Sequence, residues 1–175
     1  MGKRQMHNLI NDKHASLIQF LNTHDDLKWN QGPEKKWTTG QHIVHLIQST
    51  KPLNKALSIP KFVLQYKFGK ANRPSRSYDE VVKRYLERLA ETDGKILSPY
   101  SNKMPDTPPE GKVELINELT KQKDILLKKL EKLSEKQLDK YLVPHPAMGR
   151  MILREIIIWS AYHTEHHHKS LKANY

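Results

Sequence analysis

Apolar residues recur at helical spacing along most of this 175-residue chain, and the alternation typical of β-strands is nearly absent. Near the N-terminus the recurring apolar positions are Met6, Leu9, Ile10, Leu17 and Leu21. Residues with this spacing share one face of an α-helix, and that face has to be buried against other helices. The pattern therefore predicts an all-α protein.

Capping residues, prolines and glycines predict where the helices begin and end. The predicted helices cover approximately residues 4–23, 39–52 with a kink or restart at Pro52, 77–97, 110–133, a short helix from 135 that ends before Pro144, and 150–172. The main connections are a basic segment over 60–76, a loop rich in turn-forming residues over 98–109 and a turn over 144–149. Four main helices among these, joined by long connections, indicate a four-helix bundle with crossovers, in one domain over residues 1–175.

The chain contains no cysteine. This excludes disulfides, thiolate nucleophiles and cysteine-bound zinc, and it leaves histidine and carboxylate as the available metal ligands. No segment approaches the roughly 20 apolar residues of a membrane-spanning helix, and residues 1–20 lack the apolar core of a signal peptide. We therefore expect an intracellular, cytoplasmic protein without a membrane partner.

The chain is strongly basic, with 30 lysines and arginines against 19 acidic residues and a net charge of +11. Such a charge fits either a nucleic-acid or anionic partner or the use of lysine for solubility, and the second interpretation is favoured. The segment over 61–76 carries five basic residues and no acid, namely Lys61, Lys67, Lys70, Arg73 and Arg76. This segment supports a hypothesis of anion binding.

Two histidines one helical turn apart, His163 and His167, lie on the last predicted helix. At about 100° per residue they are separated by about 40°, and both extend the apolar stripe that faces the core. His166 flanks this stripe and His168 points elsewhere. Histidines on a core face need either hydrogen-bond partners or a metal ion, and the spacing allows both.

A third histidine, His45, lies on the second predicted helix, where the apolar residues occupy the opposite side. Its polar side also carries Gln41, His42 and Gln48, which could hydrogen-bond a substrate or a metal-bound ligand. This polar stripe either faces solvent or lines a polar cavity inside the bundle. Glu165 lies across the helix from His163, so it cannot serve as a base at a metal held by the histidine pair.

The two histidine segments together resemble the DinB/YfiT-like superfamily of metal-dependent four-helix-bundle proteins. The first matching motif is Trp37-Thr38-x-x-Gln41-x-x-x-His45-x-x-x-Ser49. The second consists of Pro146 and Gly149 before the last helix, followed by His163 and His167. Helix order and chain length also agree. Gln48 stands where family members often carry an acidic residue, which leaves any acid–base role at that position in doubt.

The resemblance implies an up-down-down-up bundle, often a homodimer, with one divalent ion held by His45, His163 and His167. It also implies activities that include hydrolysis and the transfer of low-molecular-weight thiols onto electrophiles. We expect zinc as the ion because three imidazoles suit it well, with nickel, iron or manganese as alternatives. Since the chain has no cysteine, thiol chemistry would need a small-molecule thiol from outside.

The sequence therefore predicts a metal-dependent enzyme, a hydrolase or a thiol S-transferase, acting on a small-molecule substrate. The basic segment over 60–76 and the loop over 98–109 either border the pocket, which would favour an anionic substrate or thiol cofactor, or are flexible solvated connectors. Two other hypotheses belong to different classes. One is a basic helical protein that binds nucleic acid through residues 61–76, and the other is a bundle that binds a small molecule or partner without catalysis.

Overall fold

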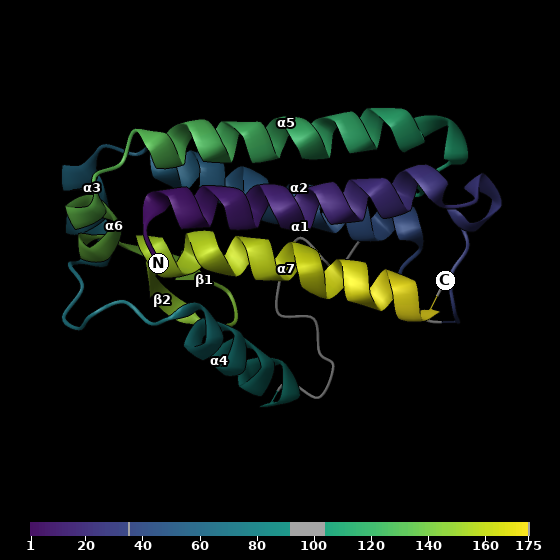
Figure 1. The fold of residues 1–175 in the computed structure, drawn as a ribbon. Coiled ribbons are helices and arrows are strands. Elements are labelled where there is room, and N and C mark those ends of the chain that lie inside the picture. Colours follow the sequence, from purple (N-terminus) through teal and green to yellow (C-terminus); the bar gives the residue numbers. More distant parts are fainter. Residues whose placement is uncertain (35, 92–103, 175) are drawn as a thin grey trace.

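Four long helices lie side by side in the computed structural model, which describes residues 1–34, 36–91 and 104–174 (Figure 1). They are α1 (Lys3–Thr23), α2 (Thr39–Ser58), α5 (Lys112–Glu131) and α7 (Leu153–Asn174). The colours in Figure 1 show that α1 and α7 run in one direction and that α2 and α5 run in the opposite one. The predicted all-α, up-down-down-up four-helix bundle is thus confirmed.

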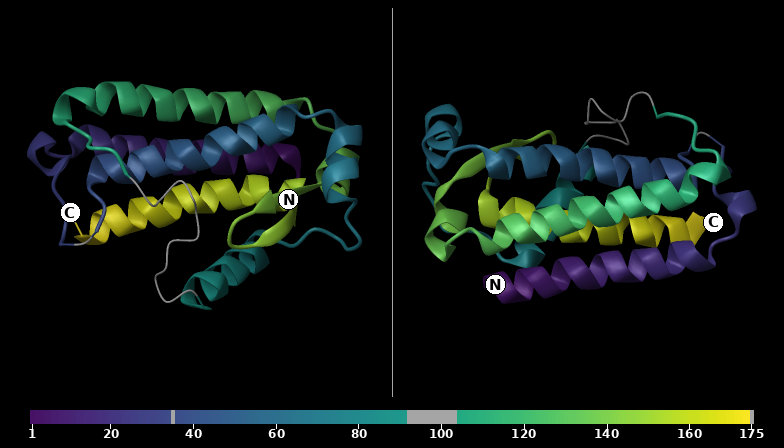
Figure 2. Two further views of the ribbon diagram at one scale, coloured as in Figure 1. Left: turned by 180° about the vertical axis from the view of Figure 1, so that it is seen from behind. Right: turned by 90° about the horizontal axis from the view of Figure 1, so that it is seen from above.

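The helices pack so that α1 and α2 each contact both α5 and α7 (Figure 2). The predicted inner stripe of α1 faces this core, because Met6, Ile10, Leu17 and Leu21 are fully buried. Most of the apolar core lies around the first half of α7, and a smaller cluster around Trp29 lies at the other end of the bundle.

Shorter elements connect the long helices. They are the 3-10 helices η1 (Asp26–Lys28) and η3 (Pro109–Gly111), the helices α3 (Lys61–Phe68), α4 (Tyr78–Glu91) and α6 (Glu135–Lys140), and the strands β1 (Leu142–His145) and β2 (Gly149–Ile152). Helix α4 packs against α7, outside the four-helix core (Figure 1). It therefore covers one side of the helix that carries His163 and His167.

Side-chain caps explain where three helices begin. The Thr38 hydroxyl accepts a hydrogen bond from the backbone N–H of Gln41, and the Gln41 side chain accepts one from the backbone N–H of Thr38. Ser134 and Gln137 form the same reciprocal pair at α6. At α4, Glu80 accepts hydrogen bonds from the backbone N–H and the hydroxyl of Ser77. These contacts satisfy backbone N–H groups that the first turn of a helix leaves without an intrahelical partner.

Helix α2 continues through Pro52 to Ser58 as one helix, so the predicted restart at Pro52 does not occur. Proline removes one intrahelical hydrogen bond, but Leu53 and Leu57 beyond it are buried in the core and stabilise the helix. The connection predicted over 60–76 also contains a helix, α3, whose single fully buried side chain is Leu64. One apolar anchor in eight residues is too weak a periodic signal to predict a helix.

The described residues also contain a short antiparallel hairpin of β1 and β2, which the sequence did not predict. Each strand has four residues, and β2 runs without a break into α7 at Leu153. The helix predicted from residue 150 therefore begins three residues later. The apolar residues Met151, Ile152 and Leu153 are all buried, and a short buried run has no periodicity that separates strand from helix.

The parts of the predicted third helix over 92–97 and of the predicted loop over 98–103 lie outside the described residues. None of the helices in the described part of the chain combines the length and the apolar composition needed to traverse a lipid bilayer.

Candidate metal centre

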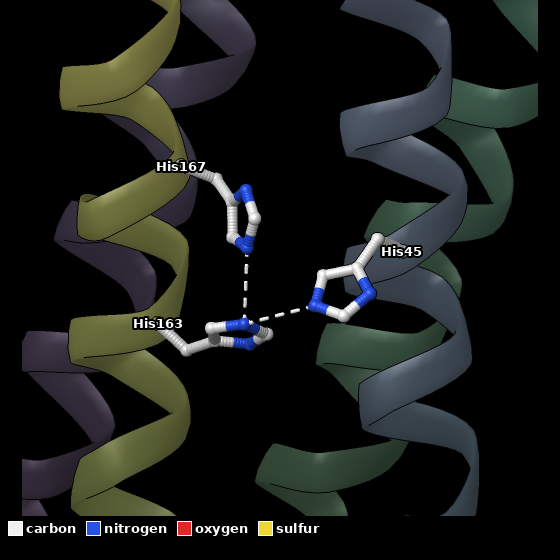
Figure 3. A group of neighbouring side chains, drawn as sticks. All are labelled: His45, His163 and His167. Atoms are coloured by element: carbon white, nitrogen blue, oxygen red, sulfur yellow. Dashed lines mark hydrogen bonds between the residues drawn. The ribbon is translucent and has the colours of Figure 1, made fainter. Parts of the chain in front are cut away.

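His163 and His167 project from one face of α7 toward α2 (Figure 3). The helix places them there because residues four positions apart share a face, and the preceding residues Ile156 and Trp159 bury the same side in the core. The two histidine residues are 4% and 6% exposed. Their Nε2 atoms lie 3.0 Å apart.

His45 projects from α2 into the same space (Figure 3). It is 9% exposed, and its Nε2 atom lies 3.2 Å from Nε2 of His163. The polar side of α2 at His45 therefore lies inside the bundle, and the alternative in which it faces solvent is excluded. One ring nitrogen from each of His45, His163 and His167 lies within 4.8 Å of the other two. The structure thus brings together the three histidines that the resemblance singled out.

The three Nε2 atoms cannot all be satisfied by hydrogen bonds among themselves. Each neutral imidazole nitrogen carries either one N–H or one lone pair, yet Nε2 of His163 faces both other Nε2 atoms. A cation at the centre accepts a lone pair from all three. Imidazole nitrogens bound tetrahedrally to zinc at 2.0–2.1 Å lie about 3.3 Å apart, close to the 3.0 and 3.2 Å that separate Nε2 of His163 from Nε2 of His167 and of His45. The donor set therefore fits a divalent ion.

Burial keeps these imidazoles in the form that binds metal. It lowers the pKa of His45 to about 4, with a further contribution from His166. Burial also lowers the pKa values of His163 and His167 well below the ordinary histidine value, and the neighbouring histidines add to this effect. A neutral imidazole has a free lone pair for a metal, whereas an imidazolium has none.

His42 contacts the other nitrogen of His167, with the two Nδ1 atoms 2.8 Å apart. If Nε2 of His167 offers its lone pair to an ion, its Nδ1 must carry the proton and donate to His42. Metal-binding histidines are commonly oriented by such a partner. Burial lowers the pKa of His42 to about 4, so His42 is neutral and able to accept. His42 therefore contacts His167 on the side of the ring that faces away from the proposed ion.

The two glutamines that were predicted to bind substrate occupy different environments. The Gln41 side chain caps α2, and its Nε2 donates to the carbonyl of Pro105 at 3.2 Å. The Oε1 atom of Gln48 is buried and has no hydrogen-bond partner among the described residues. Roles for Gln41, His42 and Gln48 in substrate binding stay predictions.

Aromatic side chains surround the histidines, and sequence reasoning gave them no role at the site. Trp159 stacks on His163 with ring centroids 4.6 Å apart, and Trp37 stacks on His167 at 6.1 Å. Tyr85 of α4 meets His163 edge-on at 6.2 Å. The sequence feature that could have predicted the Trp159 contact is its position four residues before His163, on the same face of the helix. Nothing in the sequence pointed to Tyr85, because α4 docks through tertiary packing.

Glu165 lies away from the three histidines, as the helical spacing predicts. Its carboxylate forms ion pairs with Lys13 and Lys169 and accepts a hydrogen bond from the Tyr78 hydroxyl. Burial alone would raise the pKa of Glu165, but the hydrogen bonds and charges of the two lysines hold it below its ordinary value. This carboxylate therefore stabilises the contact between α1, α4 and α7.

Comparisons with known proteins identify a family and a similar fold. The family model described as the DinB superfamily matches residues 10–171. A solved structure described as YfiT from Bacillus subtilis, "a probable metal-dependent hydrolase with an unusual four-helix bundle topology", is similar in fold. It shares 20% sequence identity and a TM-score of 0.53, over 95% of this chain and 81% of the other. A search among curated proteins found no significant match.

Proposed function

The chain belongs to the DinB superfamily, and we propose that it is a metal-dependent enzyme whose divalent ion is held by His45, His163 and His167. The observation that carries this proposal is the convergence of three buried, neutral Nε2 atoms from two helices. A site with three protein ligands leaves a position open for a reactant, which is the usual arrangement of catalytic rather than structural zinc sites.

The description of the similar structure as a probable metal-dependent hydrolase supports hydrolysis as the reaction. A bound divalent ion supplies Lewis acidity, which makes water or a small-molecule thiol nucleophilic near neutral pH. The chain itself contributes the neutral imidazoles, the orientation of His167 by His42, and aromatic walls that limit the access of bulk water. We propose zinc as the ion because three imidazoles and an open position suit it.

Thiol transfer is the second reaction that this site would support. The absence of cysteine means that the thiol would come from a small molecule. The two reactions differ in a simple way, because hydrolysis of a test ester or amide needs no added thiol. Thiol transfer to an electrophile would depend on the added thiol and on the ion.

Metal content gives the most direct test. The protein is purified without a metal-affinity step, and its divalent metals are measured by elemental analysis beside the variants His163→Ala and His7→Ala. His7 lies on α1, is half-buried and contacts Asn11, so it serves as a matched histidine control. We expect about one equivalent of metal in the wild type and in His7→Ala and none in His163→Ala. Equal metal content in all three proteins would overturn the proposal.

Activity is tested separately on panels of hydrolase and thiol-transfer substrates, with and without the ion. Metal content without turnover on either panel would favour the non-catalytic bundle. Steeply salt-dependent binding of DNA or RNA, with no metal, would favour the nucleic-acid hypothesis.

We also propose that the protein forms the homodimer that the resemblance implies. Sedimentation velocity measures the mass of the particle in solution and tests this proposal.

A further inference from the structure

A polar cavity of about 380 Å³ lies beside α4 and shares no lining residue with the three-histidine site. It is bordered by the segment over 73–76, by α4, by the β1–β2 hairpin and by the beginning of α7. Its charged lining residues are Arg73, Arg76, Arg84, Arg88, Arg150 and Glu155. Five arginines that are far apart in the sequence thus line one cavity with a single carboxylate.

The one carboxylate is already bound. Both Glu155 oxygens accept hydrogen bonds from the Arg73 guanidinium, and Glu155 also accepts one from the backbone N–H of Arg76 at 2.8 Å. Burial alone would raise the pKa of Glu155, but these hydrogen bonds and the two arginine charges lower it, so the group is ionised. Glu155 therefore pairs with Arg73 and, at 3.5 Å, with the Arg76 guanidinium, and it holds the backbone at Arg76 against α7.

The other arginines have far less compensation. Neither Arg84 nor Arg150 forms an ion pair with any described residue. Arg88 pairs with Glu91, but both side chains are substantially exposed, at 41% and 59%. Such surface pairs contribute about 0–1 kcal/mol. Glu80 lies nearby on α4, and its carboxylate caps the helix at Ser77. The cavity therefore retains a concentrated positive charge.

We propose that this cavity binds a phosphorylated small molecule. Guanidinium groups match phosphate oxygens through paired, charge-assisted hydrogen bonds. A phosphate monoester carries about −1.5 to −2 charges at pH 7, which balances more of the arginine excess than one carboxylate does. The volume lies within the usual 300–1,000 Å³ of small-molecule sites. A concave cavity of this size fits a small ligand and does not fit a nucleic-acid backbone.

The cavity is separate from the proposed metal centre but close to it. Glu155 and His163 are eight residues apart on α7, about 12 Å along the helix axis. Helix α4 contributes to both places, because Tyr85 contacts His163 while Arg84 and Arg88 line the cavity. The phosphate site would therefore exist whether or not the three histidines bind a metal.

Calorimetric titration with inorganic pyrophosphate tests the proposal. The experiment uses protein freed of metal on a chelating resin, in about 150 mM salt so that long-range surface charge is screened. It is repeated on His163→Ala, because pyrophosphate also binds metal ions. We expect saturable binding at one site in both proteins. Binding lost in His163→Ala would assign the anion to the histidine site and overturn the proposal, whereas the proposed metal centre would stand.

Variants locate the site. Arg84→Gln combined with Arg150→Gln removes two arginines that Glu155 does not bind, and Lys83→Gln removes an exposed charge from the same helix as a control. We expect at least tenfold weaker pyrophosphate binding in the double variant and less than a twofold change in Lys83→Gln. If the double variant unfolds, pyrophosphate binding is measured on each single arginine variant instead, after circular dichroism has shown that the variant is folded. Equal weakening by Lys83→Gln, or citrate binding as tightly as pyrophosphate, would contradict a phosphate site.

Discussion

The Nδ1 atoms of His42 and His167 lie 2.8 Å apart and connect α2 to α7 behind the proposed metal ligands. If His167 binds an ion through Nε2, its Nδ1 carries the proton and donates it to Nδ1 of His42, although His42 itself is not one of the three proposed ligands. If the contact orients His167, loss of His42 should lower the affinity for metal, which a purely structural role for His42 would not require.

Replacing His42 with alanine should weaken metal binding by about 10- to 100-fold, because His167 loses the group that orients its ring. A competition titration of the metal-free protein against a chromophoric chelator measures this affinity. The His7→Ala variant should bind like the wild type. An unchanged affinity in His42→Ala would show that His167 is oriented without it.

Zinc should raise the thermal stability of the wild type and leave that of His163→Ala nearly unchanged. A ligand that binds only the folded state at 100 times its dissociation constant adds about 2.7 kcal/mol to the free energy of unfolding. Melting curves of both proteins with and without zinc measure the effect. An equal rise in both proteins would mean that zinc binds elsewhere.

His14 should make the protein less stable as the pH falls. Burial lowers the pKa of His14 to about 4, despite its hydrogen bond to the carbonyl of Ile10. Between the ordinary value of 6.5 and about 4, the unfolded chain is protonated at this residue and the folded chain is not. The stability is therefore present above pH 6.5 and is lost as the pH falls through this window, by up to about 3 kcal/mol.

Urea unfolding of the wild type and His14→Asn at pH 7 and pH 4.5 checks this prediction. An asparagine amide can still donate to Ile10 but does not titrate, so the variant should lose less stability between the two pH values. Other buried histidines change both proteins equally, so the comparison isolates His14. Identical pH dependence in the two proteins would contradict the prediction.

Replacing Glu155 with glutamine should lower the free energy of unfolding by about 2–4 kcal/mol, because a 1% exposed carboxylate and its two arginine partners lose their charge balance. Glu91→Gln is the matched control, since it removes an exposed carboxylate paired with Arg88. The control should change stability by less than about 0.5 kcal/mol. Urea unfolding at pH 7 measures both, and similar small effects would show that the buried pair contributes little.

Gly40 lets two segments approach the start of α2, and alanine there should destabilise the protein by about 1–3 kcal/mol. An added Cβ would lie 2.4 Å from Oγ1 of Thr107 and 2.9 Å from Nε1 of Trp29. Gly111→Ala is the control, because a Cβ there meets nothing within 4 Å. Thermal unfolding compares the two variants. Equal stability would mean that the segment around Thr107 moves aside without cost.

Local sequence patterns were enough to predict the long helices and the placing of His163 and His167 on one helix face. These features depend on local spacing, which fixes which residues share a helix face and which side chains can cap its first turn. The resemblance then gave His45 as the third histidine, whereas its own helix left both a solvent-facing and a cavity-facing position open.

Packing between the helices determines that His45 is buried against α7, that Tyr85 lies over His163, and that five distant arginines line one cavity. The short hairpin before α7 also emerged only in the tertiary structure. The reason is physical: periodicity records which way a side chain points from its own helix, but not which element packs opposite it. That choice is made by the summed burial of apolar faces across the whole bundle.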